Sequence, residues 1–287
     1  MRTVAEGFSV FLSSLTPTTS HREAAASHRA SVKSALEAHF KVNNFFESGS
    51  FSNGTGIRYY SDVDAFVSIG LTKPLSADTG LGWVKSALVA RFPNINVRVS
   101  RPAVVVEFAN GSETWEVIPA FFTHRGGSSQ LVYDIPGPSS GWIDSAPKEH
   151  LAYVNECNVA PSVGNAKALA RLAKAWKYYC NVPISSFYLE MRAAQHVATQ
   201  TTYIHVWDIC QLFEKLQGHQ LASMNDPKGA SGRFGACSTE ARKEEALLKL
   251  DTAATRARDA LDAYNGDGID TAFHYLELLF GGQFPSR

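Results

Sequence analysis

The sequence predicts an α+β fold, with a mixed α/β first half and a helical second half. Hydrophobic and polar residues alternate over residues 59–69, as in a half-buried strand. Three more short strands are expected at residues 96–101, 103–108 and 114–122. After residue 148, the hydrophobic residues instead recur at the spacing of amphipathic helices.

Two helices and a loop are expected among the strands of the first half. Ser20 and Glu23 have the spacing of a capping box, and a helix over residues 21–42 follows them. A second helix is expected over residues 81–92. Glycines at positions 49, 54 and 56 indicate a loop before the strand at residues 59–69. The strands at 103–108 and 114–122 are separated by Asn110-Gly111, which is typical of a hairpin turn.

The second half is predicted to be helical throughout. Residues 124–147 are rich in Gly, Ser and Pro, which favours a loop between the halves, and residues 226–237 form a Gly-rich loop. We therefore expect two domains, a core at residues 1–147 and a helical lobe at residues 148–287. The helices are expected at 148–157, 164–180, 186–198, 203–217 and 239–264.

Composition restricts the class of protein. The 27 Lys and Arg residues balance 27 Asp and Glu residues, which argues against constitutive tight binding of a nucleic-acid duplex. The four cysteines form no C-x-x-C pair, so disulfides and a zinc site are not expected and a reducing compartment fits. No stretch approaches the roughly 20 apolar residues of a membrane helix. A cytoplasmic monomer without a membrane partner is the expectation.

Asp62 and Asp64 are the first candidate functional residues. Side chains at positions i and i+2 of a strand point to the same face, so the two carboxylates are expected side by side. Such a pair repels unless a cation lies between its members, and Mg²⁺ is bound by a few carboxylates together with phosphate oxygens. A solvated turn at the end of a strand is the alternative for an isolated pair of this kind.

Two further features give the Asp62 and Asp64 pair its context. Gly49 and Ser50 precede it in a Gly-rich loop, where backbone N–H groups and a hydroxyl can bind a phosphate. A third carboxylate is expected from a neighbouring strand. Glu116 has apolar neighbours and is favoured, and Glu107 is the rival candidate.

The order of these motifs resembles a known family. Residues 49–51, 54–58, 61–64 and 116–120 are similar to the core of DNA polymerase β-type nucleotidyltransferases. More narrowly, they resemble the branch that contains oligoadenylate synthetases, cyclic GMP-AMP synthase and bacterial CD-NTases. The helical half agrees, since residues 171–177 and 184–190 are similar to that branch's helical lobe. Residues 226–227 and 280–285 look like bacterial CD-NTases in particular. This chain carries Glu116 where the branch usually has aspartate.

The resemblance implies synthesis of a cyclic di- or oligonucleotide second messenger from ATP and other nucleoside triphosphates, with release of pyrophosphate. It implies two Mg²⁺ ions, with Mn²⁺ as a substitute, held by Asp62, Asp64 and Glu116. Gly49 and Ser50 would then bind the donor phosphates. A role in bacterial antiviral (CBASS-type) defence follows, in which a separate effector senses the product and no nucleic acid is required.

The helical half contributes two more candidate residues. Lys167, Arg171 and Lys174 lie on one helix face, and the alternative for such a face is simple solvation. By resemblance, Lys174 would reach the donor triphosphate, and Ser186 and Phe187 would lie beside the donor base.

Two other functions remain open from the sequence. The same core could transfer one nucleotide to a protein or RNA acceptor. Alternatively, the chain could be a non-catalytic nucleotide-binding regulator, and Glu116 is the feature that favours this alternative.

Overall fold

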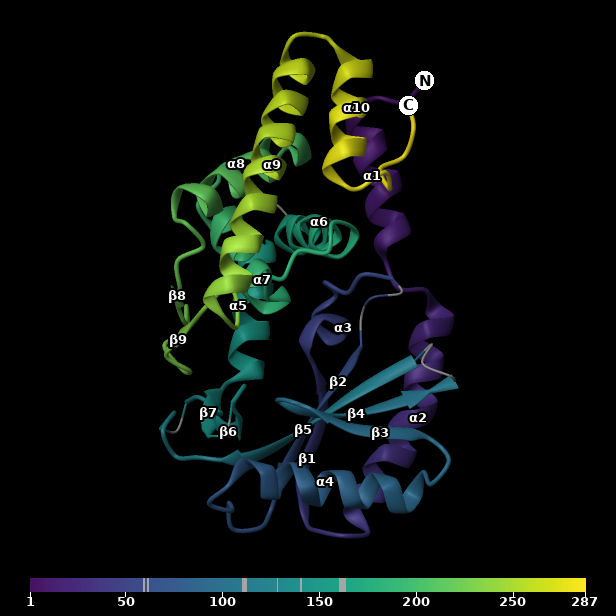
Figure 1. Ribbon diagram of the computed structural model, residues 1–287, viewed down its shortest axis with the longest axis vertical. Helices are drawn as coiled ribbons and strands as arrows, with labels where there is room; N and C mark the ends of the chain where they lie inside the picture. Colours follow the sequence, from purple (N-terminus) through teal and green to yellow (C-terminus); the bar gives the residue numbers. More distant parts are fainter. Residues whose placement is uncertain (59, 61, 110–112, 128, 140, 160–163) are drawn as a thin grey trace. The chain divides into compact units, whose positions relative to one another are not determined.

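The computed structural model describes the chain except for residues 59, 61, 110–112, 128, 140 and 160–163, and the side chains of residues 19–22 and 24–26 also lie outside the description. The described residues form two compact units (Figure 1). The sheet unit comprises Pro17–Leu151 and Asp226–Gly232, and the helical unit comprises Met1–Thr16, Ala152–Asn225 and Arg233–Arg287. The division therefore differs from the predicted domains in the first 16 residues, in residues 148–151 and in Asp226–Gly232.

The sheet unit holds most of the strands. Its strands are β1 (Val42–Ser48), β2 (Val63–Ile69), β3 (Asn96–Ser100), β4 (Ala103–Phe108), β5 (Glu113–Phe122), β6 (Tyr133–Pro136) and β7 (Trp142–Ser145). Its helices are α2 (Thr19–Glu37), α3 (Gly49–Asn53) and α4 (Ala77–Arg91), and α5 (Pro147–Val159) passes from the sheet unit into the helical unit.

The sheet is mixed, as predicted. Its strands run in the order β1-β2-β5-β4-β3, and β6 pairs with both β5 and β7. Strands β2 and β5 are parallel, whereas the other pairs in this sheet are antiparallel. The parallel pair brings the two segments that carry the candidate carboxylates next to each other.

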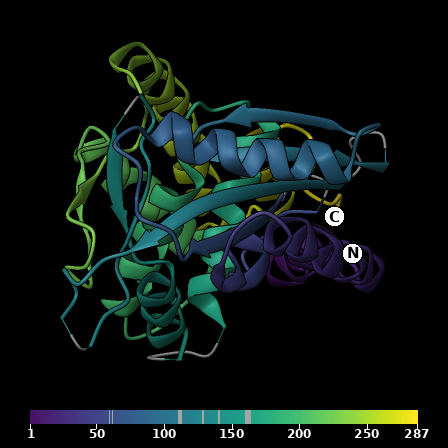
Figure 2. The same ribbon diagram turned by 90° about the horizontal axis from the view of Figure 1, so that it is seen from below.

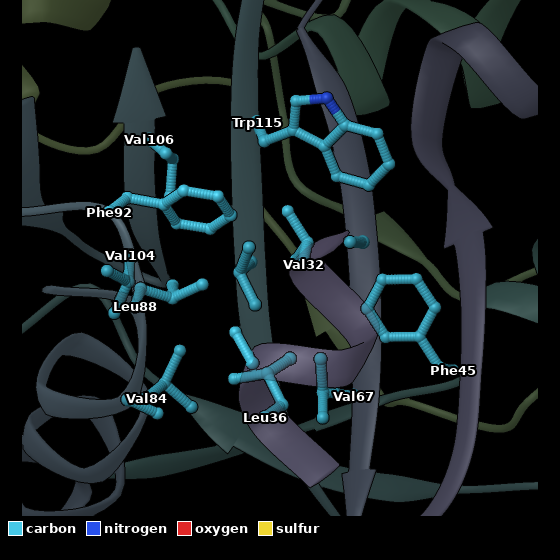
Figure 3. Close-up of a cluster of buried hydrophobic side chains, with 14 of the residues drawn as sticks. Val32, Leu36, Phe45, Val67, Val84, Leu88, Phe92, Val104, Val106 and Trp115 are labelled. Carbon is cyan, nitrogen blue, oxygen red and sulfur yellow. The ribbon is translucent and has the colours of Figure 1, made fainter. Parts of the chain in front are cut away.

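One face of the sheet is the main hydrophobic core of this unit. Alternate residues of the strands, such as Val67 and Val104, pack against Leu36 of α2 and Leu88 of α4 (Figure 3). Figure 2 shows α4 lying along the sheet. Each such fully buried side chain contributes roughly 1.5–3 kcal/mol to stability. Because side chains alternate across a strand, the other residues of β2 and β5 point to the opposite face, where polar groups can be placed.

The helical unit consists of helices that pack on one another. They are α1 (Val4–Leu15), α6 (Asn165–Tyr179), α7 (Ser186–Ala198), α8 (His205–Gly218), α9 (Glu240–Asn265) and α10 (Ile269–Leu279), with the small hairpin β8 (Met224–Asn225) and β9 (Arg233–Phe234). Trp176 of α6 and Phe213 of α8 are fully buried with ring centroids 4.8 Å apart. The predicted helices of this half are confirmed within a few residues at each end.

Helix α1 was not predicted, although the sequence carries its signal. Thr3 and Glu6 form a capping box, in which the Thr3 N–H donates to Glu6 Oε2 (2.8 Å) and the Glu6 N–H donates to Thr3 Oγ1 (3.2 Å). Phe11 of α1 packs against Phe280 and Phe284, with centroids 4.8 and 5.3 Å apart. The start of the chain is therefore held in the helical unit by the far end of the chain.

Several other elements differ from the expectation. Helix α2 ends at Glu37, before the predicted end at residue 42, and β1, which begins at Val42, was not predicted. Residues 124–147, predicted to be a loop, contain the β6–β7 hairpin, whose strands are too short to show an alternating pattern. Gly49–Asn53 forms the short helix α3 within the expected loop, and α10 was not predicted. The predicted Asn110-Gly111 turn lies outside the described residues.

In the described part of the chain, no helix is both long and apolar enough to cross a membrane.

Candidate active site

The candidate carboxylates come together at one end of the β1–β2–β5 strands. Asp62 directly precedes β2, and Asp64 is its second residue. Asp64 lies opposite Ser48 of β1 on one side and opposite Glu116 of β5 on the other. Since neighbouring strands are roughly 4.8 Å apart, the backbones that carry Asp64 and Glu116 are adjacent.

These carboxylates lie on the face of the sheet that is opposite the main core. Val63, Trp115 and Val117 are buried in that core, so Asp64 and Glu116, which alternate with them, point the other way. Asp62 lies just before β2, so the shared face of Asp62 and Asp64 stays a prediction. The local sequence thus places apolar groups in the core and acidic groups on the other side.

The ionisation of Glu116 shows that the acidic groups interact. Burial raises the pKa of Glu116 above its ordinary value, the nearby charge of Asp62 raises it further, and Arg98 lowers it. Glu116 is therefore held in a place where its charge is unfavourable. A cation between the carboxylates would remove this cost.

Position 49, directly after β1, requires glycine for two physical reasons. Its φ of +64° lies in the left-handed region, which glycine adopts without strain. A Cβ built on Gly49 would lie only 1.7 Å from Asp64 Oδ2. Ser50 follows in α3, the short helix that begins at Gly49. Gly49 thus lies beside Asp64, and phosphate binding by Gly49 and Ser50 stays a prediction.

The residues present fit a divalent metal by their chemistry. Asp62, Asp64 and Glu116 supply hard oxygen ligands, and burial together with the nearby charge of Asp62 raises the pKa of Glu116. Among the described side chains, however, no three His, Cys, Asp or Glu residues are already grouped so that they could hold a metal ion. Metal binding by these carboxylates therefore stays a prediction that requires their side chains to turn toward a common ion.

Glu107, the rival third carboxylate, has other partners. Its carboxylate accepts hydrogen bonds from Asn96 Nδ2 (2.9 Å) and Arg98 Nε (3.0 Å) at the surface of β3 and β4. These hydrogen bonds lower the pKa of Glu107. Glu107 thus has a local structural role, whereas the shift of Glu116 arises from burial and from Asp62.

Lys174 lies in the interior of the helical unit. Its side chain is 2% exposed and its Nζ is paired with Glu190 of α7, which is 4% exposed. A buried charge pair of this kind is costly to break, because the remaining partner is left without compensation. Binding of the triphosphate by Lys174 stays a prediction, and the ion pair with Glu190 is the competing structural role.

Ser186 begins α7 and contacts the end of α6. Its Oγ accepts a hydrogen bond from Lys177 Nζ at 2.6 Å and lies 3.2 Å from the Tyr178 hydroxyl. The predicted basic face of α6 comprises Lys167, Arg171 and Lys174 and does not include Lys177, which contacts Ser186. No local pattern separates Lys177 from other helix-end lysines, because its partner Ser186 lies on another helix.

Fold and site together define the class. A mixed sheet that presents acidic residues beside a glycine turn, followed by a helical unit, is the architecture of a polymerase β-type nucleotidyltransferase. The family model described as Second Messenger Oligonucleotide or Dinucleotide Synthetase domain (SMODS) matches residues 1–158, more than half of the chain. The chain belongs to this family, and the predicted resemblance to bacterial CD-NTases is confirmed.

A similar protein from another bacterium agrees with this assignment. A probable cyclic nucleotide synthase of Bacillus cereus (strain VD146) is 22% identical over 219 residues, a match that covers 71% of this chain and 62% of that relative. The match thus spans less than two thirds of that relative's length.

Solved structures share the fold over nearly the whole chain. The structure of CdnC of E. coli MS115-1 with ATP has a TM-score of 0.77 and 18% sequence identity to this protein. The match covers 98% of this chain and 99% of the CdnC chain. The structure of the CD-NTase CdnG of Bradyrhizobium diazoefficiens in complex with GTP has a TM-score of 0.74 and 13% sequence identity. This match covers 97% of this chain and 96% of the CdnG chain.

Proposed function

We propose that this protein is a nucleotidyltransferase that joins nucleoside triphosphates into a cyclic di- or oligonucleotide second messenger and releases pyrophosphate. The observation that carries the proposal is the register of β2 and β5, which sets Asp64 beside Glu116 with Asp62 close to both. Membership of the SMODS family supports this activity. The relatives solved with ATP and with GTP support nucleoside triphosphates as substrates.

In the proposed reaction, a ribose hydroxyl of the acceptor attacks the α-phosphorus of the donor, and pyrophosphate leaves. Asp62, Asp64 and Glu116 would hold two Mg²⁺ ions, or Mn²⁺ in their place. Bound Mg²⁺ supplies charge neutralisation at the attacking and leaving oxygens. The backbone at Gly49 and the Ser50 hydroxyl would bind donor phosphates, with Lys174 and Ser186 as the candidate nucleotide-binding residues of the helical unit.

The same proposal assigns a cellular role. A cyclic nucleotide product acts on a separate effector, and the family resemblance favours bacterial antiviral (CBASS-type) defence in the cytoplasm. The balanced charge of the chain, with 27 basic and 27 acidic residues, favours an enzyme that does not need a nucleic-acid activator. Equal turnover with and without duplex DNA or RNA at physiological salt is the expected result.

The direct experiment incubates the protein with Mg²⁺ and four labelled nucleoside triphosphates and analyses the products by mass spectrometry. A small product that resists phosphatase and forms with equimolar pyrophosphate release per bond would support a cyclic nucleotide. Label on a protein or RNA would instead identify transfer to a macromolecule. Nucleotide binding without pyrophosphate release in any mixture would favour a regulator.

A further inference from the structure

Three side chains form a hydrogen-bonded link at the start of β5, on the core face of the sheet. The Trp115 Nε1–H donates to Glu113 Oε1 at 2.8 Å, and His28 Nδ1 of α2 lies 2.9 and 3.0 Å from the two Glu113 oxygens. An ionised carboxylate only accepts hydrogen bonds, so His28 donates from Nδ1. The side chains of His28, Glu113 and Trp115 are called the Trp115 link below.

Packing holds the Trp115 link in one arrangement. Trp115 is fully buried in the main core (Figure 3), and the Glu113 side chain is only 12% exposed. The His28 ring stacks on Phe108 of β4, with centroids 4.0 Å apart and an angle of 7° between the ring planes. A flipped Trp115 ring would bury its N–H away from Glu113, which is unfavourable for an unsatisfied donor. The hydrogen bond to Glu113 therefore selects one orientation of the indole.

Trp115 lies at the level of the candidate carboxylates. In the parallel pairing of β2 and β5, Trp115 is opposite Val63, and the next residue, Glu116, is opposite Asp64. Val63 stands between Asp62 and Asp64 in the chain. Val63 and Trp115 both belong to the main core, so their packing sets the spacing of the two backbones that carry the carboxylates.

The acidic side chains work against this spacing when no cation is bound. Burial raises the pKa of Glu116, and the nearby charge of Asp62 raises it further, so ionised Glu116 is repelled by the acidic pair. This repulsion favours a displacement of the start of β5 away from β2. The Trp115 link opposes the displacement, because it ties the start of β5 to α2 through His28.

We propose that Glu113 is a positioning residue for the metal site. Through its hydrogen bond to Trp115, it holds the start of β5 so that Glu116 stays opposite Asp64 and these carboxylates can share an ion. Glu113 itself contacts neither the metal nor the nucleotide. This inference rests on the proposed function, because it assigns Glu113 to the metal site of that reaction.

The test titrates Mn²⁺ into the metal-free protein and measures free Mn²⁺ by electron paramagnetic resonance. Glu113→Ala should weaken Mn²⁺ binding about 10- to 100-fold, the range found when residues that support metal ligands are removed. Trp115→Phe keeps a buried ring and removes the N–H, so it should cause a similar loss, and it decides the question if Glu113→Ala does not fold. Glu214→Ala is the matched control and should bind Mn²⁺ normally, because Glu214 accepts hydrogen bonds from Arg258 within the helical unit.

Rescue and coupling distinguish positioning from a general loss of stability. Glu113→Gln keeps an oxygen that can accept from the indole and should restore most of the Mn²⁺ affinity. The double variant Glu113→Ala with Trp115→Phe should lose little more than the worse single variant, because the two residues act as a pair. In protein labelled with 5-fluorotryptophan, the ¹⁹F signal of Trp115 should shift in Glu113→Ala and stay in place in Glu214→Ala.

Three results would overturn the inference. Unchanged Mn²⁺ affinity in Glu113→Ala would show that the site does not depend on Glu113. An equal loss in Glu113→Gln would show that the hydrogen bond to Trp115 is not the cause. An equal loss in Glu214→Ala would show that lower stability alone weakens metal binding.

A product assay separates this inference from the proposed function. If the unmodified protein makes no product but its Mn²⁺ binding depends on Glu113 and Trp115, the proposed function fails and the role of Glu113 stands. If the unmodified protein makes the product and Glu113→Ala shows the same dependence of rate on Mg²⁺ concentration, the role of Glu113 fails and the proposed function stands.

Discussion

Alanine in place of Gly49 would disturb the carboxylate site through a single methyl group. The new Cβ would lie 1.7 Å from Asp64 Oδ2 and 2.5 Å from Asp64 Cγ, distances that no pair of nonbonded atoms tolerates. The Asp64 carboxylate must therefore move by an ångström or more. A displacement of this size at a catalytic group can cost about 10²-fold in rate.

The same substitution also strains the backbone. At a φ of +64°, a residue with a side chain pays roughly 1–2 kcal/mol relative to glycine. Gly127 is a matched control, because its φ is +62° and no described atom lies within 4 Å of a Cβ built there. Gly127→Ala should therefore show the backbone strain without the displacement of Asp64.

Two measurements on the two variants separate these effects. Urea unfolding should show a loss of roughly 1–2 kcal/mol in both variants, with an additional loss in Gly49→Ala. Pyrophosphate release at saturating Mg²⁺ and nucleoside triphosphates should fall about 10²-fold or more in Gly49→Ala only. The reasoning is refuted if Gly49→Ala keeps the full rate, or if Gly127→Ala loses as much activity as Gly49→Ala.

The remaining predictions concern the carboxylates and Lys174. Asp62→Asn combined with Asp64→Asn should abolish pyrophosphate release while circular dichroism stays unchanged, and full turnover in this variant would contradict the metal site. Glu116→Gln should cost about 10²-fold or more in rate, whereas Glu116→Asp should retain measurable activity, because charge matters more than length for a ligand. The pKa of Glu116 is raised in the folded state, so its contribution to stability is present below its ordinary pKa and is lost as pH rises. At pH 7, metal-free Glu116→Gln should therefore unfold at a higher urea concentration than the unmodified protein. This gain in stability should shrink at pH 4. Lys174→Ala should destabilise the fold by about 3–5 kcal/mol, because it removes one member of a buried ion pair. A stable variant with selectively weakened ATP binding would instead establish the phosphate role.

The sequence by itself determined the elements whose pattern is local. Alternation over a few residues was enough to identify β2 and to predict Asp62 and Asp64 on one face, and short apolar runs identified β3, β4 and β5. Helical spacing identified α5 to α9 for the same reason. The family signal followed from motifs that are contiguous in the chain.

Tertiary structure alone decided the features that depend on distant segments. The placement of α1 with the helical unit depends on partners far away in sequence, as in the contact of Phe11 with Phe280. The collision between a Cβ at Gly49 and Asp64 becomes visible only when β1 and β2 are paired. In the same way, Lys174 and Lys177 lie three residues apart on one helix, yet one ends in a buried ion pair and the other beside Ser186. Periodicity shows which side of its own helix a residue occupies, but the neighbouring helix determines the chemistry that the residue meets there.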